Sequence, residues 1–354
     1  MPGGAPVRAP GEPAAATAVA HPNIALIKYW GKRDEELVLP CTDSLSMTLD
    51  IFPTTTTVRC APGARRDVVT LGGVPATGEA LARIVAFLDL VRDRAGVFVR
   101  AVVDTRNTVP TGAGLASSAS GFAALAVAAA HAYGLDADPT ALSRLARRGS
   151  GSASRSIFGG FALWHAGHGS EGGAGVGGGA GGAADLASYA EPVPAGELDP
   201  ALVVAVVDAG PKHLSSRAAM RRTVETSPLY GPWAASSADD LAAMRLALLR
   251  ADLEAVGEIA ERNALGMHAT MLAARPAVRY LAPASLAVLD SVLQLRREGV
   301  LAYATMDAGP NVKVLCRSPD AQRVAAAVRT ACAGGAVHVA RPGQGARLLE
   351  ADGR

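Results

Sequence analysis

The pattern of apolar and polar positions predicts that the 354-residue chain contains both strands and helices. Short apolar runs bounded by Gly and Pro are typical of strands, and apolar residues repeating every three to four positions are typical of helices. The strands that we expect are 17–27, 97–104, 161–164, 201–210, 302–306 and 312–315, with two further short strands near the end. The helices that we expect are 81–91, 122–133, 139–148, 238–250, 253–273, 285–298 and 320–332, with another beginning near 216.

Other segments lack the apolar periodicity of strands and helices. Residues 1–16 are rich in Pro, Ala and Gly, so they bury too little apolar surface to offset ordering and should form a disordered tail. The glycine-rich tract 167–184 is expected to be a mobile hairpin loop without chemistry. Pro and Gly near 192–200 predict a boundary between an N-terminal domain, 17–195, and a C-terminal domain, 196–354.

The segment NTVPTGAGLASSASG, residues 107–121, has the composition of a phosphate-binding loop. Gly112 and Gly114 permit torsions closed to other residues and let backbone N–H groups approach an anion. A run of helix formers follows, and a helix N-terminus favours phosphate. The spacing matches neither a Walker A motif nor GxGxxG, and a Ser-capped turn is the alternative for this segment taken alone. Hydroxyl groups come from Ser117, Ser118 and Ser120.

Three further segments combine charged or hydroxyl side chains with glycine within a few positions. They are PNIALIKYWGKRD at 22–34, GSGSASRSIFGG at 149–160 and MDAGPNVK at 306–313. In this order, together with the glycine loop, they resemble the GHMP superfamily of small-molecule kinases and, within it, the ATP-dependent mevalonate diphosphate decarboxylases. The resemblance covers nearly the whole chain. It implies an α+β fold of two domains, the first like domain 2 of ribosomal protein S5 and the second an α/β sandwich, with the active site in the cleft between them.

The reaction that the resemblance implies is ATP-dependent decarboxylation of (R)-5-diphosphomevalonate to isopentenyl diphosphate, ADP, phosphate and CO₂. Asp307 follows an apolar strand and precedes the turn sequence AGPN; taken alone it could be a turn residue, but the match makes it the group that orients or deprotonates the C3 hydroxyl. Arg155 is expected to hold the substrate carboxylate with Ser150 and Ser152, a structural salt bridge being the alternative.

The family match also gives roles to the KYWGK segment. Lys28 ends an apolar strand, so its burial requires a nearby anion, either Asp307 or the transferred phosphate. Lys32 and Tyr29 are expected at the phosphorylated substrate, although Lys32 could instead lie in a solvated turn and Tyr29 could be a core aromatic residue. Trp30 is interpreted as a core residue. Ser216 and Arg217, at the start of a helix, are expected to hold the diphosphate.

The cofactors implied are ATP and Mg²⁺. Hard oxygen ligands suit Mg²⁺, so Ser117 or Ser118 is its expected protein ligand, with nucleotide oxygens supplying the rest. The residues expected to bind ATP are Pro110, Thr111, Gly112, Ala113, Gly114, Leu115, Ala116, Ser117, Ser118 and Ser120.

None of the seven histidines has an acid or base partner in the sequence, and all are left without a role.

Composition narrows the classes of protein to which the chain could belong. A net charge of +2 and 49% hydrophobic residues favour a globular enzyme and predict no nucleic-acid partner. No segment has the ~20 uninterrupted apolar residues of a membrane span. The four cysteines have no metal or disulfide spacing, so a cytoplasmic location is expected. A homodimer is expected from the resemblance.

Three rival functions would use part of the same sequence pattern. A decarboxylase for the monophosphate would share Asp307, Arg155 and Lys28, and only Lys32, Ser216 and Arg217 favour the diphosphate. A kinase that stops at the 3-phosphate would lack part of the Asp, Lys and Arg set. A non-catalytic member of the fold would lack the glycine loop or the aspartate, and the sequence retains both.

Overall fold

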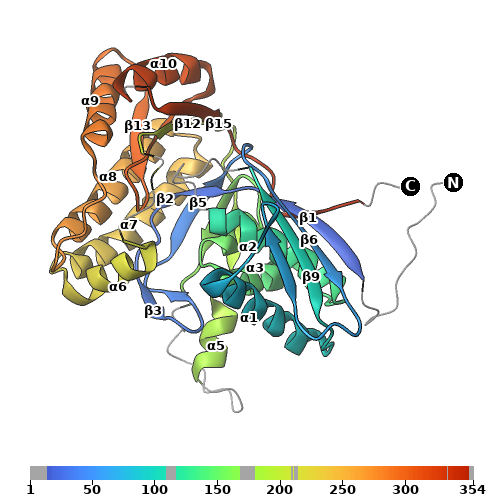
Figure 1. Cartoon of the computed structure of the whole chain (residues 1–354). Coiled ribbons are helices and arrows are strands. Elements are labelled where there is room, and N and C mark those ends of the chain that lie inside the picture. Colours follow the sequence, from blue (N-terminus) through green and yellow to red (C-terminus); the bar gives the residue numbers. More distant parts are fainter. Residues whose placement is uncertain are drawn as a thin grey trace.

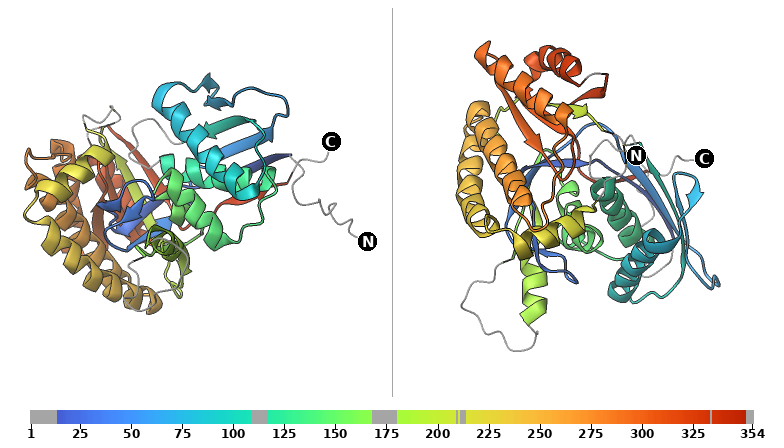
Figure 2. Two further views of the ribbon diagram at one scale, coloured as in Figure 1. Left: turned by 90° about the horizontal axis from the view of Figure 1, so that it is seen from below. Right: turned by 60° about the vertical axis from the view of Figure 1, so that its left-hand side comes forward.

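Three β-sheets carry the fold in the residues that the computed structural model describes, 14–108, 117–167, 180–208, 210, 214–332 and 334–350. Two of the sheets form the N-terminal half and the third forms the C-terminal half, each with its own helices (Figures 1 and 2). This is the α+β architecture expected.

The first sheet is built from β1 (Ala15–Ala20), β6 (Thr54–Cys60), β7 (Val68–Leu71), β8 (Val74–Pro75), β9 (Ala101–Asn107) and β16 (Arg347–Leu349). Its order is β16–β1–β6–β9–β7–β8, and only the β7–β9 pair is parallel. Helix α2 (Ser117–Ala132) packs on β1 and β6. Every second residue of β6 is buried from Thr54 to Val58, as expected for a sheet with one covered face.

The second sheet is built from β2 (Asn23–Ile27), β5 (Ser44–Thr48), β10 (Phe161–Trp164) and β11 (Ala190–Val193), in the order β11–β10–β5–β2. Every residue of β2, β5 and β10 is buried. A small hairpin of β3 (Lys32–Asp34) and β4 (Leu39–Pro40) follows β2. The KYWGK segment therefore joins a buried strand to an exposed hairpin.

The third sheet is built from β12 (Pro200–Val206), β13 (Ala302–Met306), β14 (Val312–Arg317) and β15 (Ala336–Ala340), in the order β13–β14–β12–β15. Both faces of β12 are covered, which explains its uninterrupted apolar sequence. Ala201 and Val203 contribute to a core with α9 (Pro283–Arg297) and α10 (Ala321–Ala331). Leu202 and Val204 contribute to a core shared with the second sheet.

The remaining helices connect these layers. Helix α8 (Leu253–Leu272) packs on α7 (Tyr230–Leu249) and contacts both β2 and β13, so it bridges the two halves. The other helical segments are α1 (Gly78–Ala95), α3 (Pro139–Gly149), α4 (Ala153–Ser156), α5 (Ala180–Ala187), α6 (Ser216–Thr226) and the 3₁₀ turn η1 (Ser318–Asp320).

The expected single strand 17–27 is wrong, because the chain divides it between two sheets. β1 ends at Ala20 and β2 begins at Asn23. Pro22 lies between them; it has no N–H to donate to a ladder, and its carbonyl accepts a bond from the Leu49 N–H. Because Ala15 and Ala16 already belong to β1, ordered structure begins before the end of the expected tail.

The expected strand 97–104 begins too early. Gly96 ends α1 in the left-handed region with φ 67°, and the Val97 N–H donates to Arg92 O at 3.2 Å. Residues 97–100 therefore complete the exit from α1, and β9 starts at Ala101.

The tract 167–184, expected to be a hairpin loop, ends as a helix. Residues 168–179 lie outside the described part of the chain, but α5 begins at Ala180. Arg147 pairs with Asp185, and Arg144 Nε donates to Leu186 O at 2.8 Å. These arginines of α3 anchor α5 to the N-terminal half.

The last short strand also differs from expectation. β16 does not join the C-terminal sheet; it pairs with β1, with Thr17 opposite Leu349. The strands 161–164 and 302–306 have the predicted bounds, and the predicted helices are found with ends shifted by several residues.

Candidate active site

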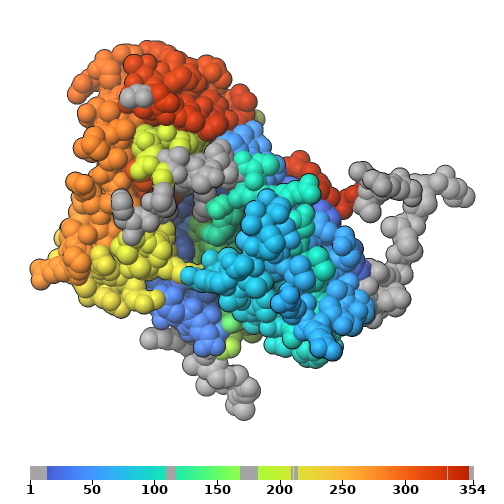
Figure 3. All heavy atoms as spheres, viewed as in Figure 1, coloured from blue at the N-terminus to red at the C-terminus, as the bar shows by residue number. Residues whose placement is uncertain are grey.

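A cavity of about 910 Å³ lies between the two halves. Its walls come from α1, α2 and the α3–α4 junction on one side, and from α6, α8 and the turn after β13 on the other. Figure 3 shows a recess between α6, in yellow, and the green and cyan segments of the N-terminal half. The predicted site residues that line the cavity are Lys28, Tyr29, Lys32, Ser117, Ser118, Ser150, Ser152, Arg155, Ser216, Arg217 and Asp307.

The Asp307 carboxylate is held by two lysines. Lys28 Nζ lies 2.8 Å from Oδ1, and Lys313 Nζ lies 3.1 Å from Oδ2. Both lysine side chains are 1% exposed, whereas the Asp307 side chain is 32% exposed toward the cavity. Burial alone would raise the pKa of the Asp307 carboxyl, but the two ammonium groups together lower that pKa well below its ordinary value. Asp307 is therefore a carboxylate at neutral pH.

A tight turn places this carboxylate at the end of β13. The Gly309 N–H donates to Asp307 O at 2.8 Å. Asn311 Oδ1 accepts bonds from the backbone N–H groups of Val207 and Asp208, and Ser285 Oγ donates to Pro310 O. The AGPN turn is thus tied to β12 and α9, so Asp307 is displayed by a rigid segment.

Lys28 lies at the end of β2, as the apolar run before it predicts. Its N–H donates to Asn263 Oδ1 at 2.9 Å, and its ammonium donates to Ala25 O at 2.8 Å. Burial lowers the pKa of Lys28 to about 8, although the partner Asp307 raises it. The expected pairing of Lys28 with an anion is confirmed.

Arg155 is buried on α4 and directed into the cavity. Nη1 donates to Ser44 Oγ at 2.5 Å, and Nε and Nη2 donate to Asn23 Oδ1 at 3.3 Å. The guanidinium also lies over the Trp164 ring, 5.7 Å from its centroid. Burial lowers the pKa of Arg155 to about 10, so it stays charged.

No carboxylate in the described part of the chain forms an ion pair with Arg155. The alternative of a structural salt bridge is therefore not what these residues show. A buried cation without a carboxylate partner favours binding of an anion from the cavity.

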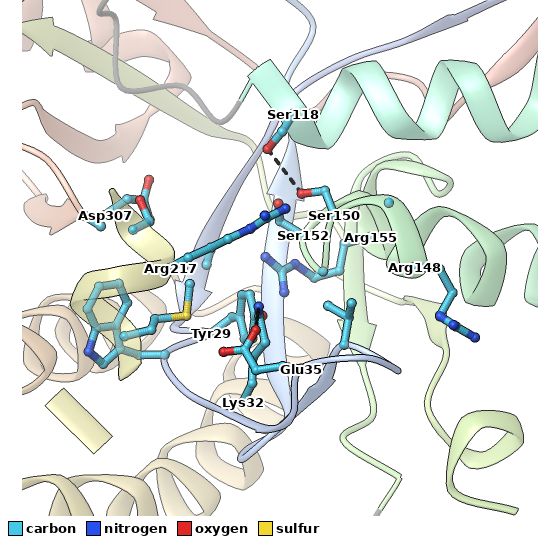
Figure 4. A pocket seen from close by; sticks show the side chains of 18 of the residues that line it. Tyr29, Lys32, Glu35, Ser118, Arg148, Ser150, Ser152, Arg155, Arg217 and Asp307 are labelled. Atoms are coloured by element: carbon cyan, nitrogen blue, oxygen red, sulfur yellow. Dashed lines mark hydrogen bonds and ion pairs between the residues drawn. The ribbon is translucent and has the colours of Figure 1, made fainter. Parts of the chain in front are cut away.

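The N-terminus of α2 faces the same space. Ser118 Oγ and Ser150 Oγ are 3.1 Å apart, joining the predicted phosphate loop to the predicted carboxylate site (Figure 4). Ser120 has a different position: it is fully buried, 2.7 Å from Thr54 Oγ1, and does not line the cavity. The other predicted loop residues, Pro110, Thr111, Gly112, Ala113, Gly114, Leu115 and Ala116, lie outside the described residues.

The side chains expected at the diphosphate already contact carboxylates. Lys32 pairs with Glu35, and Arg217 Nη1 lies 3.5 Å from Glu79 Oε1 across the cleft. Ser215 caps α6 by accepting the Ala218 N–H, so Ser216 is the first helical residue. Figure 4 shows Lys32 and Glu35 below Tyr29 and Arg155 in the pocket.

The two aromatic residues of KYWGK lie in different environments: Trp30 in an apolar core and Tyr29 at the cavity. Trp30 is 2% exposed and belongs to an apolar core with Trp233 and Met271. Tyr29 packs edge-on against Trp164 with ring centroids 4.7 Å apart. Its buried hydroxyl has no hydrogen-bond partner in the described residues and lines the cavity, and burial raises its pKa.

Sequence reasoning missed several residues of the site. Lys313 and Asn23 share one signal: each is a buried polar residue in a strand whose neighbouring positions are apolar, Asn23 at its start and Lys313 at its second position. Ser44 has no such signal, because its contact with Arg155 depends on the position of β5 in the second sheet, where β5 pairs with β10. Arg83 and Arg148 also line the cavity from α1 and α3. Together with the predicted lysines and arginines, they make the cavity cationic.

Two domain families and many known proteins resemble the chain. The diphosphomevalonate decarboxylase-like N-terminal domain family matches residues 20–174, and the mevalonate 5-diphosphate decarboxylase C-terminal domain family matches residues 202–342. The diphosphomevalonate decarboxylase mvd1 of Aspergillus fumigatus is 36% identical over 89% of this chain and 80% of its own length. A phosphomevalonate decarboxylase of Haloferax volcanii is 34% identical over 88% of this chain and 91% of its own length.

A solved structure described as MDDEF in complex with MVAPP, AMPPCP and magnesium has a TM-score of 0.87. It is 43% identical, with 96% of this chain and 99% of that chain covered. The fold and the cleft site thus define a two-domain protein with a GHMP kinase-like fold. The chain belongs to the diphosphomevalonate decarboxylase family.

Proposed function

We propose that this chain catalyses the ATP-dependent decarboxylation of 5-diphosphomevalonate to isopentenyl diphosphate, ADP, phosphate and CO₂. One observation carries the proposal: a cationic cavity brings an ionised carboxylate, Asp307, and a buried guanidinium, Arg155, to a single substrate-sized space. A 3-hydroxy acid offers the complementary pair, a hydroxyl group for Asp307 and a carboxylate for Arg155.

Asp307 acts first on the C3 hydroxyl of the substrate. Because two lysines hold its pKa low, the carboxylate is a poor proton acceptor at neutral pH and a good hydrogen-bond acceptor. We therefore assign it mainly to orienting the hydroxyl oxygen. That oxygen bonds to the γ-phosphorus of ATP as the bond to the ADP oxygen breaks, and the hydroxyl proton passes to a phosphoryl oxygen. Lys28, beside Asp307, neutralises negative charge during the transfer.

Arg155 acts in the second stage. The 3-phosphate leaves with positive character at C3, the bond from C2 to the carboxylate breaks, and its electrons form the C2–C3 double bond as CO₂ departs. Arg155, Ser150 and Ser152 hold the carboxylate in the orientation that this cleavage requires. The Tyr29 hydroxyl, buried without a described partner, and Lys32, Ser216 and Arg217 bind the distal phosphates.

ATP and Mg²⁺ fit the described part of the cavity. Ser117 and Ser118 line it at the N-terminus of α2, where backbone N–H groups and the helix dipole favour phosphate. Their hydroxyls are hard oxygen ligands suited to Mg²⁺, which would neutralise charge on the nucleotide phosphates. In the described residues no cluster of three His, Cys, Asp or Glu could hold a metal, so we assign most of the ligands to the nucleotide.

A decarboxylase for 5-phosphomevalonate is the second candidate, because a relative of that name is nearly as similar as the diphosphate enzymes. Single-turnover reactions with ATP, Mg²⁺ and each substrate separate the two. We expect CO₂, ADP and phosphate in equal amounts from the diphosphate alone. Preference for the monophosphate would select the second candidate, and ADP without CO₂ would indicate a kinase.

We also propose a homodimer in the cytoplasm that has no nucleic-acid partner. None of the described helices is both long and apolar enough to cross a membrane. None of the four cysteines forms a disulfide in the described residues. Sedimentation velocity at micromolar concentration measures the oligomeric state, and a monomer throughout that range would contradict the dimer.

A further inference from the structure

Lys313 contacts Asp307 but does not itself line the cavity. Its ammonium is 3.1 Å from Asp307 Oδ2, yet its side chain is 1% exposed and does not line the cavity, unlike Lys28 and Asp307. Lys313 lies on β14, opposite Thr305 of β13. It therefore approaches Asp307 from behind, from the sheet that supports the turn.

The charges around Asp307 show what Lys313 adds. Lys28 at the end of β2 already pairs with Oδ1, Arg155 of α4 contributes a more distant positive charge, and His268 of α8 packs nearby. Burial lowers the pKa of His268 to about 4, so the imidazole is neutral. Among the described residues, the Asp307 carboxylate thus contacts two ammonium groups, and Lys313 Nζ also lies 3.4 Å from Asn311 O.

Lys313 binds the oxygen of Asp307 that Lys28 does not contact. With only Lys28, the carboxyl group could rotate about its Cβ–Cγ bond and present either oxygen. With Lys313 on the second oxygen, both are fixed, and the plane of the carboxylate is defined by β2 and β14 together. Precise placement of such a group matters because a displacement of about 1 Å can cost on the order of 100-fold in rate.

We propose that Lys313 is a positioning residue for the decarboxylation: it holds Asp307 Oδ2 so that the carboxylate meets the substrate hydroxyl in one orientation. The proposal rests on the role proposed for Asp307. It assigns Lys313 to the chemical step and not to substrate binding, because the buried side chain does not line the cavity.

The test compares Lys313→Met with Thr305→Val. Lys313→Met removes the ammonium but leaves the neutral Lys28–Asp307 pair, so the fold should be retained. Thr305→Val is a matched control on the adjacent strand: it changes a buried side chain whose hydroxyl has no described partner. Melting temperature, kcat, KM for both substrates and the pH dependence of kcat are measured for each, after the wild type has been shown to release CO₂.

For Lys313→Met we expect kcat to fall on the order of 100-fold with KM nearly unchanged. We also expect the basic limb of the kcat profile to move to higher pH, because Lys313 lowers the pKa of Lys28. Thr305→Val should leave both properties as in the wild type. A lysine that only supports the fold would lower the melting temperature and leave kcat unchanged.

Three results would overturn the proposal: an unchanged kcat, a raised KM with unchanged kcat, or losses in Thr305→Val that equal those in Lys313→Met. A wild type that releases no CO₂ from either substrate would instead contradict the proposed function. The two failures are therefore distinguishable before any variant is compared.

Discussion

Lys28 and Asp307 are 279 positions apart in the chain, yet their side chains form the central ion pair of the site. The environment of each sets its chemistry. Asp307 stays ionised because lysines contact both oxygens, and Lys28 loses proton affinity because it is buried. At the scale of single residues, the site is a set of charges whose protonation states are fixed by their neighbours.

Asp307→Asn removes the negative charge but keeps the shape. We expect kcat to fall by about 100- to 10,000-fold, because the amide orients the hydroxyl poorly and no longer balances two lysines. KM should change little, since Arg155 and the distal cations remain. Steady-state CO₂ release measures the effect, and Asp290→Asn, on the exposed side of α9, is the matched control. A variant with wild-type kcat would contradict the role of Asp307.

The lowered pKa of Lys28 predicts a pH dependence. Lys28 is charged below about pH 8 and neutral above it, so kcat should fall as pH rises through about 8. The pH profile of kcat checks this. In Lys28→Arg the residue remains charged at higher pH, so the basic limb should disappear from the remaining activity. An identical limb in both proteins would assign the titration to another group.

At the scale of elements, the contact between the KYWGK segment and α7 sets the position of several site residues. Tyr230, the first residue of α7, donates its hydroxyl to Trp30 O at 2.9 Å. Gly31 makes this possible: its φ is +107°, and a Cβ there would lie 2.0 Å from the Tyr230 hydroxyl oxygen. Tyr29 and Lys32, on either side, depend on this approach.

Gly31→Ala should therefore lower the free energy of unfolding by more than about 2 kcal/mol, through backbone strain and overlap with Tyr230. Gly63→Ala is the control, because Gly63 also has positive φ but open space around it; a cost of about 1 kcal/mol is expected there. Urea denaturation measures both. Equal losses would show that strain alone, without the Tyr230 contact, explains the effect.

The sequence predicted elements well where a pattern is local. The helix 253–273 and the strands 161–164 and 302–306 have clear periods or apolar runs, and the structure has them. The expected strand 17–27 failed because apolar character continues across Pro22 while the sheet partners change. Partners come from distant segments, which a local pattern does not encode.

The same limit applies to the site. Asp307 and Arg155 were predictable because they lie in short motifs at the ends of elements. The placement of Lys313 against Asp307 Oδ2 was not, because it requires the register of β13 and β14 together with the turn between them. Ser120 looks like its neighbours Ser117 and Ser118 in sequence, but helical geometry turns it into the core.

At the scale of the whole molecule, the two halves are joined by more than the cleft. Helix α8 packs on β2 and β13, and β16 returns to pair with β1 at the edge of the first sheet. The N-terminal half therefore includes β16, which follows every other strand in the part of the chain that the structure describes.

A chain truncated after residue 346 loses β16. We expect the free energy of unfolding to fall by about 1 to 3 kcal/mol, because a few backbone hydrogen bonds to β1 are lost. Truncation after residue 350 keeps β16 and is the control. Urea denaturation of the two proteins checks the difference, and equal stability would show that β16 adds nothing to the first sheet.

The pairing of β16 with β1 affects how the chain folds during its synthesis. A ribosome releases the N-terminal half long before it reaches residues 347–349, so β1 has an uncovered edge while the other half is being made. The first sheet can reach its full width only after residues 347–349 have been made. Folding of this sheet is thus completed by a strand that is translated long after the strand it pairs with.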